Sequence, residues 1–73
     1  MARIAVKSEI TGTVWKIEVS PGTAVANGDT LIVIESMKME IPVLANAPGT
    51  VREILVSEQQ PVAEGQDVVI LDT

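Results

Sequence analysis

The sequence contains no cysteine, histidine, tyrosine or phenylalanine, and Trp15 is its only aromatic residue. Without cysteine and histidine there is no disulfide, no zinc site of the usual ligand set, and no thiol or imidazole for catalysis. A chain of 73 residues also has little room for both a hydrophobic core and a cleft that encloses a substrate. We therefore expect a protein that is not an enzyme by itself, with no catalytic residues and no metal site.

Basic residues are also scarce, with five Lys and Arg against ten Asp and Glu and a formal net charge of -5. Nucleic-acid binding needs a basic cluster and aromatic platforms, so we expect no nucleic-acid partner. Lys7 and Glu9 interrupt the apolar residues near the N-terminus, and we expect no membrane segment and a cytoplasmic location. Because 47% of the residues are hydrophobic, we expect one folded domain over residues 1–73, monomeric in isolation.

The chain repeats itself at an offset of 37 residues without a gap. Residues 12–36 align with residues 49–73, and nine of the 25 aligned pairs are identical. Each half is therefore interpreted as one supersecondary unit, and the two units are expected to pack about a pseudo-twofold axis.

Within each unit, β-forming residues alternate with turn-forming residues and no helical period is present. This pattern predicts an all-β fold, either a compact sandwich or a flattened barrel. The apolar runs 31–34 and 68–71 are interpreted as inner strands covered on both faces. All five glycines are expected to mark turns.

The repeat also predicts a tight turn at Lys38. In the repeat, residue 36 aligns with the last residue, 73, and residue 38 aligns with the first residue, 1. The segment around Lys38 is therefore the symmetry mate of the place where the two chain ends would meet. We expect the termini to lie together at the opposite end of the molecule. On pattern alone, the favoured interpretation is that Met37 and Met39 are inward-facing strand residues and that Lys38 points to water. On a turn, by contrast, Lys38 is accessible to a modifying enzyme and is flanked by flexible apolar side chains.

The segment 35–40, Glu-Ser-Met-Lys-Met-Glu, resembles the biotin attachment motif of biotin carboxyl carrier domains in the biotinyl/lipoyl attachment family. The flanking Pro-Gly, Asn-Gly-Asp and Gly-Thr-Val segments match as well, and Ile41-Pro42-Val43 is most similar to small stand-alone biotin/lipoyl attachment proteins. The resemblance implies two four-stranded antiparallel sheets with the modified lysine at a hairpin tip. It also implies covalent biotin on Lys38, with the neighbouring recognition residues Glu35, Ser36, Met37 and Met39.

The resemblance further implies that biotin ligase joins biotin to Lys38, and that the swinging arm carries carboxylate from a biotin carboxylase to a carboxyltransferase. The domain would supply tethering, while the chemistry belongs to the cofactor and the partner enzymes. Two positions depart from the family pattern. Ser36 stands where Ala is commoner, and Gln59-Gln60 replaces a usual Gly-Asp, which suggests a different, looser turn.

Two alternatives stay open from the sequence. The first is a lipoyl carrier of an oxidative decarboxylation or glycine cleavage system; lipoyl domains typically have Asp before and Ala after the lysine, so Met37 and Met39 favour biotin. The second is an unmodified interaction module of the same fold.

Overall fold

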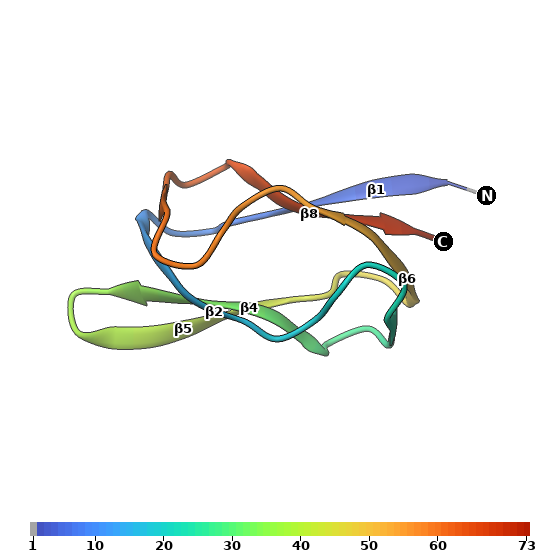
Figure 1. Ribbon diagram of the computed structural model, residues 1–73, viewed down its shortest axis with the longest axis horizontal. Helices are drawn as coiled ribbons and strands as arrows, with labels where there is room; N and C mark the ends of the chain where they lie inside the picture. The colour runs from blue at the N-terminus through green and yellow to red at the C-terminus, as the bar shows by residue number, and fades with distance from the viewer. Residues whose placement is uncertain (1) are drawn as a thin grey trace.

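The strands of the two repeat units form two layers that face each other (Figure 1). The computed structural model describes residues 2–73. The strands, in chain order, are β1 (Arg3–Lys7), β2 (Gly12–Ile17), β3 (Ala24–Val25), β4 (Thr30–Ser36), β5 (Met39–Leu44), β6 (Gly49–Ile54), β7 (Pro61–Val62) and β8 (Asp67–Asp72). One antiparallel sheet has the order β1-β8-β6-β3 and the other β5-β4-β2-β7. The predicted all-β sandwich of two four-stranded sheets is confirmed, although the sheets do not close into a barrel.

The internal repeat is visible in how the strands are distributed between the sheets. A shift of 37 residues places β1 on β5, β2 on β6, β3 on β7 and β4 on β8, and each pair has one member in each sheet. The central strands β2 and β4 of one sheet are therefore equivalent to the central strands β6 and β8 of the other. The end of the molecule with the β4–β5 hairpin is likewise equivalent to the end where the chain termini lie (Figure 1). This arrangement is the expected pseudo-twofold symmetry.

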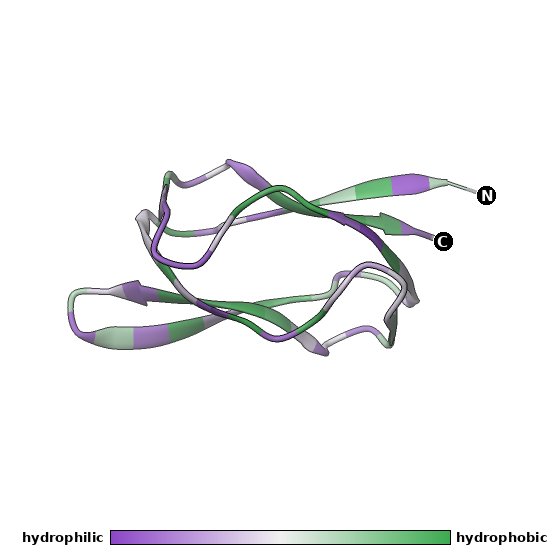
Figure 2. Cartoon of the chain, viewed as in Figure 1, coloured by the Kyte–Doolittle hydropathy of each residue, from purple (hydrophilic) through white to green (hydrophobic). Residues whose placement is uncertain are grey.

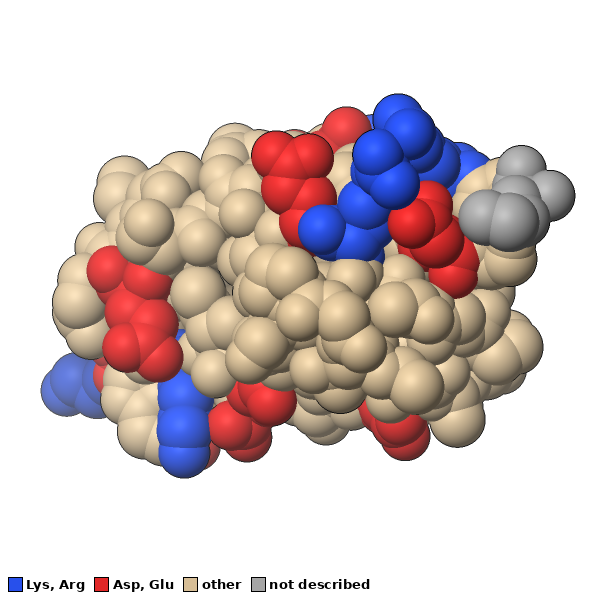
Figure 3. Space-filling model, turned by 45° about the vertical axis from the view of Figure 1, so that its right-hand side comes forward, with Lys and Arg blue, Asp and Glu red and all other residues tan. Residues whose placement is uncertain are grey.

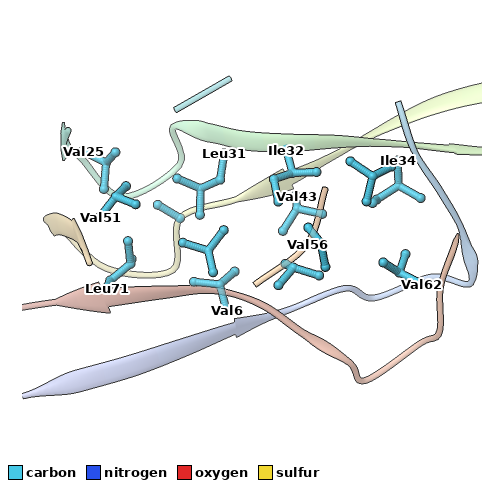
Figure 4. Packing of buried hydrophobic residues seen from close by; sticks show 14 residues of the cluster. Val6, Val25, Leu31, Ile32, Ile34, Val43, Val51, Val56, Val62 and Leu71 are labelled. Atoms are coloured by element: carbon cyan, nitrogen blue, oxygen red, sulfur yellow. The ribbon is translucent and has the colours of Figure 1, made fainter. Parts of the chain in front are cut away.

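The core lies between the two sheets, where side chains from both layers meet (Figure 4). Hydrophobic and hydrophilic residues alternate in the part of β5 next to the hairpin, whereas the middle of β4 is hydrophobic throughout (Figure 2). The buried hydrophobic residues are Val6, Val14, Val25, Leu31, Ile32, Ile34, Val43, Ala45, Val51, Val56, Val62, Val68, Val69 and Leu71. The central strands β4 and β8 contribute the fully buried residues of the two apolar runs, as predicted.

The expectation that these runs are covered on both faces is wrong. Leu31 and Ile32 are consecutive and both fully buried, whereas Val33 is only half-buried. The pairing of β4 with β5 shifts register between Thr30 and Ile32, and such a bulge puts an extra residue on one strand. The bulge therefore explains why two successive side chains turn into one core without a second covering layer.

Three glycines lie in turns as predicted, and two do not. Gly22, Gly28 and Gly65 have φ of 95°, 92° and 86°, which non-glycine residues rarely adopt. Gly12 and Gly49 instead begin strands β2 and β6. At both positions a β-carbon would collide with a carbonyl oxygen of the neighbouring strand. The turn assignment for these two glycines is therefore wrong, and they are needed because the backbones of two strands approach closely there.

The turn at Gln59 does not differ from its repeat mate at Gly22, contrary to expectation. Gln59 has φ of 72° and occupies the left-handed position. The Gln60 amide donates to the Ser57 carbonyl at 3.2 Å, as the Thr23 amide donates to Ser20 at 3.0 Å. The Gln60 side chain also accepts from the Ser57 amide at 3.0 Å. These bonds hold a glutamine in a conformation that glycine adopts at lower cost.

Replacing Gln59 with glycine is therefore expected to stabilise the domain by about 0.5–1 kcal/mol. Glycine removes the cost of the left-handed backbone conformation, and the greater conformational entropy that glycine loses on folding offsets part of this gain. The melting temperature should rise by a few degrees in a thermal unfolding experiment. Gly22→Ala is the matched control, because a β-carbon there meets nothing within 4 Å and only φ opposes it. Gly22→Ala should lower the melting temperature, and a fall for Gln59→Gly would contradict the explanation.

The two chain ends meet at one end of the sandwich, away from the β4–β5 hairpin (Figure 1). The Thr73 amide donates to the Ala2 carbonyl at 2.9 Å, and the Ala2 amide donates to the Thr73 carbonyl at 3.2 Å. The molecule is 36 Å long and 17 Å across in the other directions. The predicted placement of the termini is confirmed, so chain attached at either end would leave the hairpin unobstructed.

Candidate functional site

Lys38 lies at the tip of the hairpin that joins β4 to β5. Ser36 and Met39 form the last strand pair, and only Met37 and Lys38 lie between them. Both have positive φ, 51° for Met37 and 66° for Lys38, as a type I′ turn requires. The predicted turn is confirmed. The alternative with inward-facing methionines is wrong, because the exposed fractions are 93% for Met37 and 62% for Met39.

The turn uses residues that its backbone conformation disfavours. Asn, Asp and Gly are the usual residues of a type I′ turn, whereas each ordinary side chain in the left-handed region costs about 1–2 kcal/mol. Neither Met37 nor Lys38 belongs to the buried core, so packing does not compensate this cost. Strain held at an exposed tip in this way is typical of a functional position.

The hairpin is fixed at its base. Ile34 is fully buried in the core. The half-buried Ser36 donates its hydroxyl to the Thr11 carbonyl at 3.0 Å, and the Thr11 hydroxyl accepts from the Glu64 amide at 3.1 Å. Hydrogen bonds therefore hold the strand ends below the turn, while the side chains of Met37 and Lys38 are exposed to solvent.

Ser36 was predicted as a recognition residue, and its bond to Thr11 is a supporting contact that sequence reasoning missed. The repeat carried a signal for it, since Ser36 aligns with Thr73, another hydroxyl residue. The Thr73 hydroxyl also bonds a backbone carbonyl, that of Ala2, at 3.3 Å. A hydroxyl therefore bonds a backbone carbonyl at each of the two strand ends, although Thr11 and Ala2 are not repeat mates.

The Lys38 amine differs from every other basic side chain in the described part of the chain. Arg3 and Arg52 both lie against Asp72, Lys7 pairs with Asp67 at 2.5 Å, and Lys16 pairs with Glu18 at 3.6 Å. Figure 3 shows this mixing of acidic and basic groups on one face of the molecule. Within residues 2–73, Lys38 alone among the basic residues has no ion-pair partner, and it is exposed.

Glu35 and Glu40 lie directly opposite each other below the turn. Both are exposed, and like charges in this cross-strand arrangement are unfavourable. Their repeat mates are Asp72 and Arg3, which form an ion pair across β8 and β1. In the hairpin, the acidic pair Glu35 and Glu40 therefore takes the place of the ion pair that their repeat mates form. The predicted flanking residues Glu35 and Ser36 both lie within two strand positions of the turn.

Lys38 does not line the groove that the structure shows. This groove of about 830 Å³ opens between β1 and β5, and none of residues 35–39 lines it. No cluster of three or more His, Cys, Asp or Glu side chains that could hold a metal occurs in residues 2–73. Over the same residues, no helix has the length and apolar character needed to cross a bilayer. What the arrangement offers chemically is an exposed primary amine at the tip of a hairpin, without an ion-pair partner among residues 2–73.

Comparison with known proteins gives consistent results. The profile of the family described as "Biotin-requiring enzyme" matches residues 4–71. The chain is 39% identical over 66 residues to a biotinylated protein TB7.3 homolog of Mycobacterium leprae, covering 90% of this chain and 93% of that protein. It is 37% identical over 67 residues to a biotin/lipoyl attachment protein of Bacillus subtilis, covering 92% of this chain and 90% of that protein.

The structural comparison extends this similarity to large enzymes. The crystal structure of the Kluyveromyces lactis urea carboxylase contains a region that superposes with a TM-score of 0.93 and 35% identity. That match covers 99% of this chain and 6% of the carboxylase chain. The fold therefore occurs both in small proteins of this length and as a minor part of a multidomain enzyme.

Proposed function

The chain belongs to the biotin/lipoyl family of biotin-requiring enzymes, and from that premise we propose that Lys38 is the residue that carries its biotin. The domain is a carrier of covalently bound biotin and not a catalyst. The proposal assigns Met37 and Met39 as the flanks by which a biotin ligase recognises the turn, with Glu35 and Ser36 beside them.

One observation carries the assignment of Lys38. Its amine lies on an exposed turn and, among the basic side chains of residues 2–73, it alone has no ion-pair partner. Lys7 and Lys16 project from strands β1 and β2 and are paired with acidic residues. An amide-linked group therefore fits at Lys38 without breaking any contact of the fold.

The residues of this chain perform the attachment step as follows. In the ligase active site, the Lys38 nitrogen attacks the acyl carbon of biotinyl-adenylate. The new amide bond forms, adenylate leaves, and the amine gives up a proton. Biotin held on Lys38 would supply a ureido nitrogen as the acceptor for carboxylate. Tethering by the hairpin would raise the effective concentration of biotin at each partner's site. The hydrogen bond from Ser36 to Thr11 at the base of the hairpin holds the attachment point at one end of a domain that is 36 Å long.

Carboxylases are the partner class that the relatives support, since the chain also matches part of the human mitochondrial propionyl-CoA carboxylase alpha chain, with 38% identity over 66 residues. A biotin ligase, a biotin carboxylase and a carboxyltransferase are the specific partners of the proposal. A monomeric state and a cytoplasmic location belong to the same proposal. The carboxylase relatives favour the biotin carrier over the lipoyl carrier.

Intact mass spectrometry after co-expression with biotin ligase tests the proposal. The unaltered domain should gain one biotinyl group, and Lys38→Arg should gain none, because arginine keeps the charge but has no acylable primary amine. Lys7→Arg and Lys16→Arg are the matched controls and should each gain one group. Acylation should also make the protein one charge more negative than -5 in native electrophoresis.

The other outcomes discriminate among the alternatives. A lipoyl group on Lys38 after co-expression with a lipoyl ligase, with no biotin accepted, would favour the lipoyl carrier. A biotinyl group that persists in Lys38→Arg would move the attachment site elsewhere. A correctly folded domain that accepts neither group would overturn both carrier functions and leave an unmodified interaction module.

A further inference from the structure

The sulfur atoms of this chain are concentrated at the attachment turn. There is no cysteine, and methionine occurs three times, at Met1 and on both sides of Lys38. Met37 and Met39 have exposed fractions of 93% and 62%. Exposure controls how readily a thioether is oxidised. Among residues 2–73, Met37 and Met39 contain the only sulfur atoms, and both lie directly beside Lys38.

We propose that Met37 and Met39 form a reversible modification site, at which a hydroperoxide oxidises the thioethers to sulfoxides and thereby slows biotin attachment at Lys38. The inference rests on the proposed function, because its consequence is measured as biotin attachment. It adds a second modification to the same turn, with hydroperoxides as the class of reactant.

The chemical step needs no catalyst from this chain. A sulfur lone pair attacks the terminal oxygen of the hydroperoxide, an S–O bond forms and the O–O bond breaks. The leaving oxygen takes up the proton, which gives water when hydrogen peroxide is the oxidant. The sulfur is oxidised and the peroxide is reduced. Methionine sulfoxide reductases reverse the change, with a separate enzyme for each sulfoxide epimer.

The structure separates the effect on recognition from an effect on folding. Neither methionine belongs to the buried core, and Met39 is joined to Ser36 through strand pairing. A sulfoxide at either position therefore projects into water in the free domain. In the complex with a ligase, by contrast, a flexible apolar contact would become a polar and chiral one.

The difference in exposure also sets an order. Met37 is nearly fully exposed at the turn, whereas Met39 begins β5 on the strand face that leads to Ile41 and the core residue Val43. Met37 should therefore be oxidised first. Once biotin is attached, oxidation no longer affects attachment, so the site acts on newly made, unmodified domain.

The test uses the unmodified 73-residue domain, treated with hydrogen peroxide that is then removed with catalase before a purified biotin ligase is added. Peptide mass spectrometry should place oxygen on Met37 faster than on Met39. The kcat/KM for biotin attachment should fall about tenfold or more, the order expected when an unpaired polar oxygen enters an apolar contact. Treatment with methionine sulfoxide reductases should restore the rate, and circular dichroism should show the same fold throughout.

The double variant Met37→Leu with Met39→Leu is the matched control, since it keeps Met1 and Trp15. Whatever its own rate, peroxide should not change that rate. An equal fall in the control, an unfolded oxidised domain, or full oxidation of both methionines without a change in rate would each overturn the inference. If the untreated domain accepts no biotin, the proposed function itself fails; if it accepts biotin and oxidation has no effect, only this inference fails.

Discussion

Replacing Gly12 with alanine is expected to destabilise the domain by about 3 kcal/mol or more, at the upper end of overpacking effects. The new β-carbon would lie 2.5 Å from the Glu35 carbonyl oxygen and 2.8 Å from the Ile34 Cγ2 atom. Ile34 is fully buried, and Glu35 pairs with both neighbouring strands. Neither neighbour can move without opening the central strand of its sheet. Because a chain of this length has a total stability of only about 4–11 kcal/mol, much of the stability should be lost.

Gly49→Ala is the matched comparison, because Gly49 is the repeat mate of Gly12 and also begins a strand. Its β-carbon would approach the Asp72 carbonyl oxygen at least as closely as that of Gly12 approaches Glu35, but its nearest side-chain atom is the exposed Thr73 Cγ2 at 3.3 Å instead of the buried Ile34 Cγ2 at 2.8 Å. Gly49→Ala should therefore destabilise less than Gly12→Ala when both are measured by urea unfolding. The opposite order, or a Gly12→Ala variant as stable as the original chain, would show that the strand contact at Gly12 is not the cause.

These glycines also mark what the sequence does and does not reveal. The repeat was sufficient to predict short strands, the pairing of the units, the turn at Lys38 and the meeting of the termini, because each follows from symmetry and turn residues alone. Gly12 and Gly22 look alike in the sequence, yet one is needed for a strand contact and the other for its φ. Close approach depends on which strand becomes a neighbour, and the sequence does not contain that information locally.

Two other differences have the same origin. Leu31 and Ile32 share one core because of a register shift against β5, whereas the apolar run alone suggested two covered faces. Gln59 keeps the turn of its glycine counterpart because Gln60 and Ser57 bond each other, which a comparison of residue types does not show. In both cases a tertiary or local hydrogen-bonding constraint overrides the preference of the residue itself.

At the site, the sequence predicted the position of Lys38 but not the reason for its availability. The ion pair of Lys7 with Asp67 joins residues 60 positions apart in the sequence, which no local spacing rule connects. The opposition of Glu35 and Glu40 likewise appears only once the hairpin register is known. The proposed attachment residue is therefore distinguished by the lack of an ion-pair partner among residues 2–73 as well as by its flanking methionines.

Exchanging the two turn residues, Met37→Lys together with Lys38→Met, is expected to lower the rate of biotin attachment by about 10²-fold or more while leaving stability unchanged. Both positions have positive φ and neither belongs to the core, so the exchanged turn has the same composition and the same backbone strain. The amine, however, moves by one residue, about 3.8 Å along the chain, and leaves the turn in a different direction. A displacement much smaller than this is enough to reduce a positioned reaction by about 10²-fold.

The rate is measured as biotin incorporation over time by intact mass, with thermal unfolding of the same samples as the measure of stability. Met37→Leu controls for the loss of the first methionine flank and should reduce the rate less than the exchange does, because its amine stays in place. Moving the lysine the other way, with Lys38→Met and Met39→Lys, puts it at the start of β5 opposite Ser36 and should be equally poor. Attachment at a rate near that of the original chain in either exchanged variant would mean that the ligase selects any exposed lysine near the tip, and that the geometry of the turn does not determine the site.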